Sequence, residues 1–393
     1  MKKMICCWIS VLLLCACSAD PKEVNQIVKG EETEKKKETD TIVSFVGVGD
    51  NLIHNSIYEE ADREAGSEGD GKYSFIQMYE PIQKHIKDAD LAFLNQETIL
   101  GGDELGLSGY PTFNTPSSIA DDIEDAGFDL INTATNHCLD KWQTGVENSA
   151  KVWGAKKGIK TAGTYVSQED RNTIRTMKRK GITFSFLAYT YGTNGVEPQY
   201  PFSVSYFDEA QIRNDVAKAK EVSDVVIVSA HWGTENSMEV NEEQRYYAQL
   251  FADLGVDVVI GTHPHVIQPI EWKKGANGNE TLIVYSLGNF LSGMLEVDNM
   301  LGGMISFDFV KDHKTKEIHI KNVEWIPTIT HYEADVSDIM NTRHHYRTYR
   351  LIDYSEKLAK KHGLNGYEGQ SVTIEALKTT TASIIDKKFL KGE

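Results

Sequence analysis

Cysteine is scarce in the part of this sequence that can fold. Four of the five cysteines, Cys6, Cys7, Cys15 and Cys17, lie within the first 17 residues, which leaves Cys138 alone in the rest of the chain. An internal disulfide framework is therefore excluded for the folded part. Basic residues are also in deficit, because 41 Lys and Arg face 58 Asp and Glu, for a net charge of −17. Such a charge repels phosphate backbones, so we expect no nucleic-acid partner.

Long apolar runs are missing as well. The short run from Met4 to Leu14 cannot span a bilayer as a stable helix and resembles the centre of a signal peptide, which we predict at residues 1–16. Leu14-Cys15-Ala16-Cys17 resembles a bacterial lipobox, in which Cys17 is lipidated. We therefore expect an exported chain, lipid-anchored at the outer face of the cytoplasmic membrane through a polar tether at residues 17–41. The alternative is an ordinary cleaved signal with incidental cysteines.

Short apolar runs rich in β-branched residues alternate with longer amphipathic stretches along the middle of the chain. This alternation is typical of an α/β fold, in which helices cover a sheet. The predicted strands cover residues 42–48, 90–94, 128–134, 182–188, 224–229, 256–260, 282–286, 304–309 and 318–325. Helices are predicted at residues 75–87, 117–126, 142–157, 208–222 and 242–254. We assign this pattern to one domain at residues 42–330 and expect a C-terminal helical extension at residues 331–393, with helices at 343–361 and 373–390.

Side chains of the types that bind metals follow several of the predicted strands. Asp50 and His54 follow the first strand, Glu97 the second, Asn136 and His137 the third, and His231, His263 and His265 two later strands. In α/β sheets, ligands bind at the edge formed by the carboxyl ends of the strands. Carboxylate, amide and imidazole groups together suit hard and borderline cations, so this clustering indicates a metal centre.

Each of these residues also has a purely structural explanation. Asp50 alone is explained as a helix cap or turn residue, and Asn136-His137 as a turn with an Asx hydrogen bond. The run His263-Pro264-His265 is more specific, because Pro264 fixes its own φ and biases His263 towards extended backbone. We expect this geometry to let both imidazoles face one site.

Other catalytic chemistries find less support in the sequence. Cys138 beside His137 is better explained as a small buried thiol than as a nucleophile, because adjacent side chains on a turn usually diverge. The serines lack a G-x-S-x-G elbow, which disfavours a serine hydrolase. The paired glycines lack the lysine and the spacing of a phosphate-binding loop.

Taken in order, the strand-end motifs carry a family resemblance. They are Gly49-Asp50, Asn95-x-Glu97, Asn136-His137, His231-Trp232-Gly233, Gly261-x-His263-Pro264-His265 and Tyr285 to Phe290. This series resembles the CapA family, which is named for poly-γ-glutamate capsule synthesis and is itself similar to the calcineurin-like metallophosphoesterases. The match runs from about Ile42 to Pro327. The resemblance implies a four-layer α/β/β/α sandwich that holds two divalent metal ions, such as Mn, Zn or Fe.

The resemblance also implies roles for single residues. The implied metal ligands are Asp50, Glu97, Asn136, His231, His263 and His265, with Glu97 bridging the two ions. His137 is the implied catalytic acid and binds no metal. The chain departs from the phosphoesterase pattern at two points, because Leu52 stands where that pattern has histidine and Glu97 replaces the usual bridging aspartate. We expect His54 to substitute as a ligand, since a residue four positions after Asp50 can face the same way if a helical turn follows.

These features lead to a first hypothesis, a surface-anchored, metal-dependent phosphoester hydrolase that acts in capsule or cell-envelope polymer biosynthesis. In it, the metal ions acidify a water and His137 protonates the leaving group. The expected partners are the membrane, through the lipid anchor, a phosphoester or anionic polymer substrate, and a polymer synthase or export machinery. Two alternatives stay open: a non-catalytic, metal-containing accessory in anionic polymer export, and a γ-glutamyl amide hydrolase that uses the same metals.

Overall fold

The computed structural model of this chain describes residues 39–390. The predicted signal peptide, the Cys17 lipidation site and nearly all of the predicted tether lie outside the described residues. Within residues 39–390, none of the helices combines the length and the apolar character that crossing a membrane requires. The first described element is β1 (Thr41–Leu52), which contains the strand predicted at residues 42–48.

Residues 39–390 form two β-sheets, and β1 lies in the middle of the first. The other strands of this sheet are β2 (Leu91–Gln96), β3 (Leu130–Asn132), β4 (Lys160–Ala162), β11 (Asn289–Ser292), β12 (Leu301–Lys311), β13 (Ile318–Glu333) and β14 (His344–Arg350). Their order is β14-β13-β12-β1-β2-β3-β4, and β11 pairs with the end of β1. The strands from β1 to β4 are parallel, whereas β12, β13 and β14 join by antiparallel pairing.

The second sheet consists of β5 (Arg175–Arg179), β6 (Ile182–Thr190), β7 (Val225–His231), β8 (Val258–Thr262), β9 (Ile267–Lys274) and β10 (Glu280–Leu287). Their order is β5-β6-β7-β8-β10-β9, with a parallel centre and one antiparallel strand at each edge. Every residue of β7 and β8 is buried. Such continuous burial is typical of strands in a sheet that is covered on both faces.

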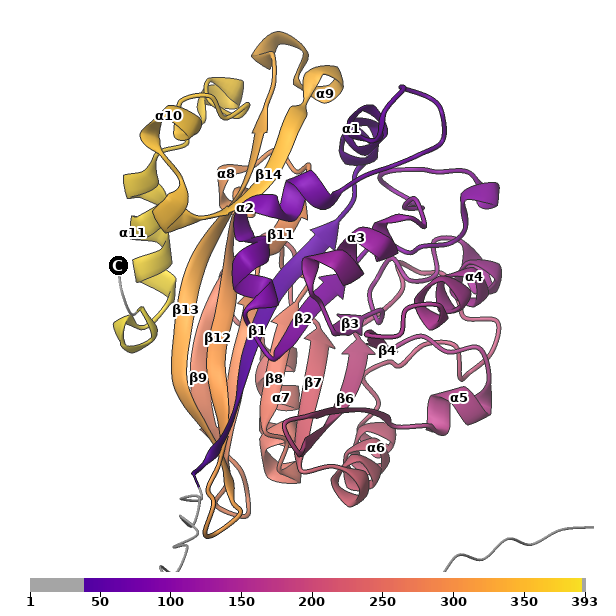
Figure 1. The fold of residues 1–393 in the computed structure, drawn as a ribbon, viewed down its shortest axis with the longest axis vertical. Coiled ribbons are helices and arrows are strands. Elements are labelled where there is room, and N and C mark those ends of the chain that lie inside the picture. The colour runs from indigo at the N-terminus through magenta and orange to yellow at the C-terminus, as the bar shows by residue number, and fades with distance from the viewer. Residues whose placement is uncertain (1–38, 391–393) are drawn as a thin grey trace, which may run out of the picture. The chain divides into compact units, whose positions relative to one another are not determined.

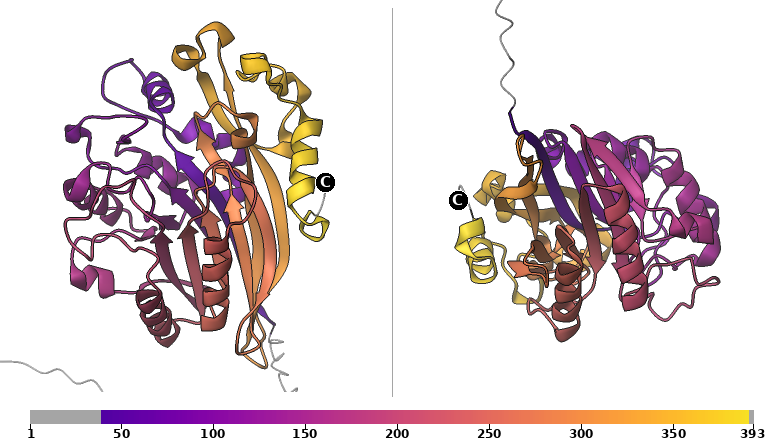
Figure 2. Two further views of the ribbon diagram at one scale, coloured as in Figure 1. Left: turned by 180° about the vertical axis from the view of Figure 1, so that it is seen from behind. Right: turned by 90° about the horizontal axis from the view of Figure 1, so that it is seen from below.

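Helices cover the outer face of each sheet, while the inner faces meet (Figure 1). The first sheet has α1 (Asn55–Ala65), α2 (Ile76–Lys87), α3 (Ile119–Ala126) and α4 (Trp142–Gly154), and the second has α6 (Glu209–Val222) and α7 (Glu242–Leu254). Figure 2 shows the same layers from behind and from below. The remaining helices are α5 (Gln168–Asn172), α8 (Val297–Met300), α9 (Ile339–Thr342), α10 (Glu356–Ala359) and α11 (Ile374–Ile384). The predicted four-layer α/β/β/α sandwich is therefore confirmed.

Aromatic side chains from both sheets interlock between the inner faces. Phe93 of β2 meets Phe186 of β6 edge to face, with ring centroids 6.0 Å apart. Phe184 and Phe309 make a similar contact at 5.0 Å. Each buried aromatic side chain contributes about 1.5–3 kcal/mol to stability. This packing holds the sheets so that β1, β2, β7 and β8 point the same way and end at the same edge (Figure 1).

The structure corrects the sequence prediction beyond residue 325. β13 continues through Pro327 to Glu333, and residues 344–350 form β14, which pairs with it, so the helix predicted at residues 343–361 is wrong there. Tyr346 and Thr348 are buried on β14 between more exposed neighbours, which is the alternation of a strand. Helix α11 confirms the first part of the helix predicted at residues 373–390, but it ends at Ile384.

Candidate metal centre

Six of the eight predicted metal and catalytic residues converge where the two sheets end. The first sheet supplies Asp50, Glu97 and Asn136, and the second supplies His231, His263 and His265. All six are buried. Ligand-type atoms of Glu97, His263 and His265 lie within 4.8 Å of one another. The fold thus joins side chains that are far apart in sequence, such as Asp50 and His265 with a separation of 215 residues.

Asp50 is held by hydrogen bonds from both sheets. Asn95 Nδ2 donates to Asp50 Oδ1 at 2.7 Å, and Asn132 Nδ2 donates in turn to Asn95 Oδ1 at 2.7 Å. From the second sheet, the backbone N–H of His263 lies 3.3 Å from Asp50 Oδ2, and His265 Nδ1 lies 3.1 Å from the same oxygen. Such contacts fix the direction of a carboxylate that is to bind a cation.

Glu97 is the least satisfied group of the cluster. Its side chain is fully buried, and neither carboxylate oxygen has a hydrogen-bond partner. His265 Nε2 lies 3.5 Å and His231 Nε2 3.9 Å from Glu97 Oε1. Burial raises the pKa of Glu97 well above its usual range, although the neighbouring His265 lowers it. Because a buried carboxylate is costly without a compensating charge, these two oxygens fit a bound cation.

The backbone around Pro264 turns in an unexpected way. His263 has a φ of 98° and His265 a φ of 59°, so the extended backbone predicted at His263 is wrong. The two rings nevertheless approach each other, with centroids 5.8 Å apart. Left-handed backbone at non-glycine residues costs on the order of 1–3 kcal/mol each and is typical of functional sites. His263 Nδ1 is buried without a hydrogen-bond partner and so offers a third free ligand atom beside the two Glu97 oxygens.

The protonation of the three histidines differs. Burial, reinforced by the neighbouring histidines, lowers the pKa of His231 and His263 well below the usual value, so both rings are neutral and offer lone pairs. Burial also lowers the pKa of His265, but the Glu97 and Asp50 carboxylates outweigh it and raise the pKa of His265 to about 10. A proton on His265 therefore partly balances two carboxylates, and a bound cation would take over this role.

A contact between Asn136 and His231 links the two sheets close to Glu97. His231 Nε2 lies 3.0 Å from Asn136 Oδ1, and His231 Nδ1 lies 3.0 Å from Thr262 Oγ1. The threonine orients the imidazole in the manner of the outer partners of metal-binding histidines. Two ligand-type atoms at this separation can share one cation, whose bonds to nitrogen and oxygen are about 2.0–2.2 Å long.

His137 pairs with an acidic residue at the rim of the cluster. Its Nδ1 lies 2.7 Å from Asp140 Oδ2, and the backbone N–H of Phe113 donates to the same oxygen at 2.7 Å. The Phe113 ring packs edge-on against the imidazole, with centroids 4.6 Å apart. His137, Asp140, Asn136 and Glu235 line a cavity of about 320 Å³. With Nδ1 engaged, Nε2 is the ring atom available for proton exchange.

His54 lies next to the cluster, at the start of α1. Its Nδ1 lies 3.2 Å from the Leu52 carbonyl oxygen and 3.2 Å from the backbone N of Gly293. Within residues 39–390, this ring has no hydrogen-bond or ion-pair contact with the six converging residues. Burial, with a contribution from the Arg343 charge, lowers the pKa of His54 to about 3, so its ring is neutral. Its role as a metal ligand stays a prediction.

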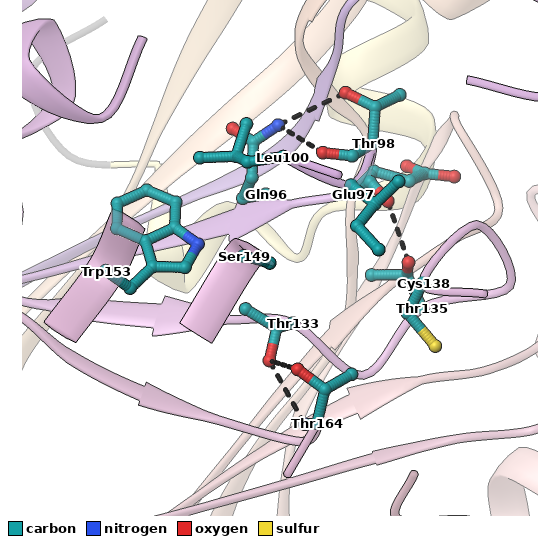
Figure 3. Close-up of a pocket in the computed structure, with 11 residues that line it drawn as sticks. Gln96, Glu97, Thr98, Leu100, Thr133, Thr135, Cys138, Ser149, Trp153 and Thr164 are labelled. Atoms are coloured by element: carbon teal, nitrogen blue, oxygen red, sulfur yellow. Dashed lines mark hydrogen bonds between the residues drawn. The ribbon is translucent and has the colours of Figure 1, made fainter. Parts of the chain in front are cut away.

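A smaller cavity lies next to Glu97 (Figure 3). Among the described residues that line it, the ionisable side chains are Glu97 and Cys138. The Thr135 hydroxyl donates to the Glu97 carbonyl oxygen at 2.7 Å and so fixes the backbone at the ligand. Cys138 is buried, and burial raises the pKa of its thiol to about 12. A thiol of this kind is inert, which agrees with the interpretation of Cys138 as a small packing residue.

The residues that sequence reasoning missed are the partners that orient the others. They are Asn95 at Asp50, Asp140 at His137, Thr262 at His231, and Asn289, whose Oδ1 lies 3.1 Å from His265 Nδ1. The spacing of His137 and Asp140, three residues apart, is the one local signal among them. Sequence analysis gave Asp140 no role at the site.

Comparison with known proteins gives a consistent family match. Residues 44–294 match the family described as "Bacterial capsule synthesis protein PGA_cap". The "PGA biosynthesis protein CapA" of Bacillus subtilis (strain 168) is 28% identical over 266 residues, which are 67% of this chain and 67% of that protein. The "Capsule biosynthesis protein CapA" of Bacillus anthracis is 26% identical over 300 residues, or 72% of this chain and 66% of that protein. The match thus spans about two thirds of the length of each relative.

Solved structures are more distant. A phosphatase from Mycoplasma pneumoniae aligns with 74% of this chain and 94% of its own, at 17% sequence identity and a TM-score of 0.46.

Proposed function

Because this chain belongs to the bacterial capsule synthesis protein family PGA_cap, we propose that it acts in the synthesis of a capsule or cell-envelope polymer as a metal-dependent phosphoester hydrolase. The observation that supports the reaction best is the unpaired Glu97 carboxylate, buried among histidines and next to the His137–Asp140 pair. A hydrolase of this class needs a cation site and a proton donor side by side.

The proposed cofactor is a pair of divalent ions such as Mn, Zn or Fe. The proposed ligands are Asp50, Glu97, Asn136, His231, His263 and His265, with Glu97 as the bridge. Neutral imidazoles, carboxylates and an amide oxygen form a donor set that suits borderline cations. When bound, such ions supply an activated water and neutralise charge that develops on a phosphoryl oxygen.

In this proposal, His137 holds the proton that the leaving group receives. The Asp140 carboxylate accepts a hydrogen bond from Nδ1–H, which orients the ring and leaves Nε2 as the nitrogen that would carry the transferable proton when the ring is doubly protonated. Phe113 holds the pair through its backbone N–H and its ring. A leaving oxygen in the adjacent cavity can then take the Nε2 proton. Asp140 is thus a positioning residue that acts through His137.

The lining of the cavity favours a second candidate reaction, the hydrolysis of a γ-glutamyl amide. Among the described residues that line it, none is Lys or Arg, whereas Asp140 and Glu235 are acidic. Apart from bound metal ions and a protonated His137, a phosphate group therefore finds no cationic side chain among these lining residues. The scissile amide of a γ-glutamyl compound is itself uncharged, unlike a phosphoryl group, and metal ions polarise carbonyl groups as well as phosphoryl groups.

We further propose that the chain is exported and lipidated at Cys17, and that it works at the outer face of the cytoplasmic membrane. The names of the two Bacillus relatives, which refer to PGA and capsule biosynthesis, support a place in the cell envelope. An anionic polymer substrate and a polymer synthase or export machinery are the partners that this place suggests. The net charge of −17 disfavours nucleic acid.

Hydrolysis assays on the metal-loaded protein test the reaction. The substrates are an aryl phosphate, a bis-aryl phosphodiester and a γ-glutamyl anilide, each with wild type and His137→Ala. Phosphoester turnover that falls in His137→Ala supports the proposal, and turnover of the anilide alone favours the amidase. If the loaded protein hydrolyses none of the three but binds poly-γ-glutamate, a non-catalytic accessory role replaces both.

A further inference from the structure

A second group of histidines lies on β13 and β14, and it shares no residue with the candidate metal centre. Its middle is the Glu333 carboxylate at the end of β13. His345 Nδ1 lies 3.6 Å and His331 Nε2 4.0 Å from Glu333 Oε1. Ligand-type atoms of Glu333, His344 and His345 lie within 4.8 Å of one another.

A β-bulge brings the two consecutive histidines of this group together. His331 pairs with Arg347 and Glu333 with His344, so two residues of β14 oppose one residue of β13. His345, within the bulge, has a φ of 58°. In a regular strand, consecutive side chains point to opposite faces, yet the His344 and His345 rings are 4.6 Å apart. Bulges and left-handed residues that redirect side chains in this way are typical of functional sites.

His331 provides an independent sign of a missing ligand. Its side chain is 2% exposed, and its Nδ1 lies 2.7 Å from the Tyr354 hydroxyl. Its Nε2 has no hydrogen-bond partner and lies on the side of Glu333. The neighbouring His362, by contrast, uses both ring nitrogens, one with a backbone carbonyl and one with a backbone N–H. Buried ring nitrogens are normally satisfied, so the free Nε2 of His331 requires an explanation.

We propose that His331, Glu333, His344 and His345 bind a divalent transition-metal ion such as Zn²⁺. Imidazole nitrogens and a carboxylate oxygen are ligands that Zn²⁺ uses, with bonds of about 2.0–2.2 Å, so two ligands of a tetrahedral ion lie about 3.3 Å apart. Small side-chain shifts close the observed gaps of 3.6 and 4.0 Å. His344 Nδ1 lies 2.8 Å from the Thr342 carbonyl oxygen, and this bond leaves Nε2 as the ligand atom.

Lys361 competes for the same carboxylate. Its Nζ lies 3.0 Å from Glu333 Oε1, and its side chain is 52% exposed. An exposed ion pair of this kind is weak, and the lysine can turn into solvent when a doubly charged ion binds. Removal of the Lys361 side chain should therefore tighten binding of the metal ion, whereas removal of the histidines should weaken it.

The ion would connect the end of β13 to the start of β14. Arg343, directly before His344, is buried and donates to the Gly293 carbonyl oxygen. The Gly293 N–H lies 3.2 Å from His54 Nδ1. The proposed ion would therefore stiffen a hairpin that is linked through Arg343 to the loop beside His54, and it should raise the thermal stability of the chain.

Zn²⁺ counting on the full chain tests the site. After equilibrium dialysis and metal analysis, we expect the double variant His344→Gln/His345→Gln to bind one Zn²⁺ fewer per chain than wild type. Lys361→Gln should bind this ion at least about tenfold more tightly. His319→Gln is the matched control and should change nothing, because His319 of β13 faces only the exposed Glu317, which directly precedes that strand, with 3.7 Å between His319 Nε2 and the Glu317 carboxylate.

The candidate metal centre is also proposed to bind metal, so the comparison is repeated in a His263→Ala background, where the same loss of one ion is expected. Equal Zn²⁺ counts in wild type and in the double variant would overturn the proposal, as would an equal loss in His319→Gln. Should the double variant fail to fold, Lys361→Gln decides, because an affinity unchanged from wild type contradicts the competition that the proposal requires.

Discussion

Replacement of Asp140 by asparagine is the sharpest test of the proposed acid. The substitution keeps the shape of the side chain and an oxygen for the Phe113 N–H, but it removes the charge that faces His137 Nδ1 at 2.7 Å. Hydrogen bonds to charged groups contribute about 1.5–3 kcal/mol, and 1.4 kcal/mol is a factor of ten. We therefore expect Asp140→Asn to lower turnover by about 10- to 100-fold.

His137→Ala should cost more, about 10²- to 10⁴-fold, because the proton donor itself is lost. The double variant should then be no worse than His137→Ala alone, since Asp140 acts through that ring. The assay measures turnover of whichever substrate proves active, together with metal content and melting temperature in the same preparations. Asp129→Asn is the control, because Asp129 is a partly buried carboxylate at the opposite end of β3, where it pairs with Arg179 at 2.6 Å.

Two results would refute this reasoning. Full turnover in Asp140→Asn with reduced turnover in His137→Ala would show that the carboxylate does not assist the ring. Losses that multiply in the double variant would show that the two residues act independently. Loss of metal in His137→Ala would instead place His137 among the ligands, since a ligand loses metal and stability together when it is truncated.

Three further outcomes are expected. Glu97→Gln should lower the metal content below two ions per chain, because the bridge serves both, and full loading would contradict that assignment. Cys17→Ser should release the chain from the membrane fraction, whereas unchanged mass and retention would exclude lipidation. Burial raises the pKa of Asp257 from 3.8 to about 6, so the folded chain takes up a proton that the unfolded chain does not. As pH rises from about 4 to about 6, the free energy of unfolding of wild type should therefore fall relative to that of Asp257→Asn by up to about 3 kcal/mol. Urea unfolding of both proteins at each pH measures this difference, and a difference that does not change with pH would contradict the prediction.

Sequence patterns predict the strands that carry the site because those strands are runs of buried aliphatic residues. β7 and β8 lie within about two residues of their predicted bounds. β14 does not follow this rule, since its buried side chains are Tyr346 and Thr348 and its pairing with β13 decides its conformation. Aromatic and β-branched residues favour strands only where a neighbouring strand accepts them, which a local pattern does not reveal.

The residue types of the site are predictable for a similar reason, because the ends of parallel strands gather at one edge. The contacts that orient them are not predictable. Asn95 reaches Asp50 from the next strand, and the backbone N–H of His263 reaches Asp50 from the other sheet. The positive φ of His263 likewise opposes the local preference that Pro264 imposes, because these tertiary contacts hold the turn.

The order of the strands along the chain has a consequence for when the candidate centre could bind metal. β1 to β4 belong to the first sheet, β5 to β10 to the second, and β11 to β14 to the first again. In the sequence, the second sheet is therefore an insertion between two parts of the first. During synthesis, the first half of the candidate centre emerges before any of its histidines from β7 and β8. A growing chain that stops before His231 therefore offers only Asp50, Glu97 and Asn136 of the six proposed ligands, and these oxygen donors favour abundant hard cations such as Mg²⁺. The complete donor set, and with it the choice of ion, becomes available only in the compartment where the last strands join the fold.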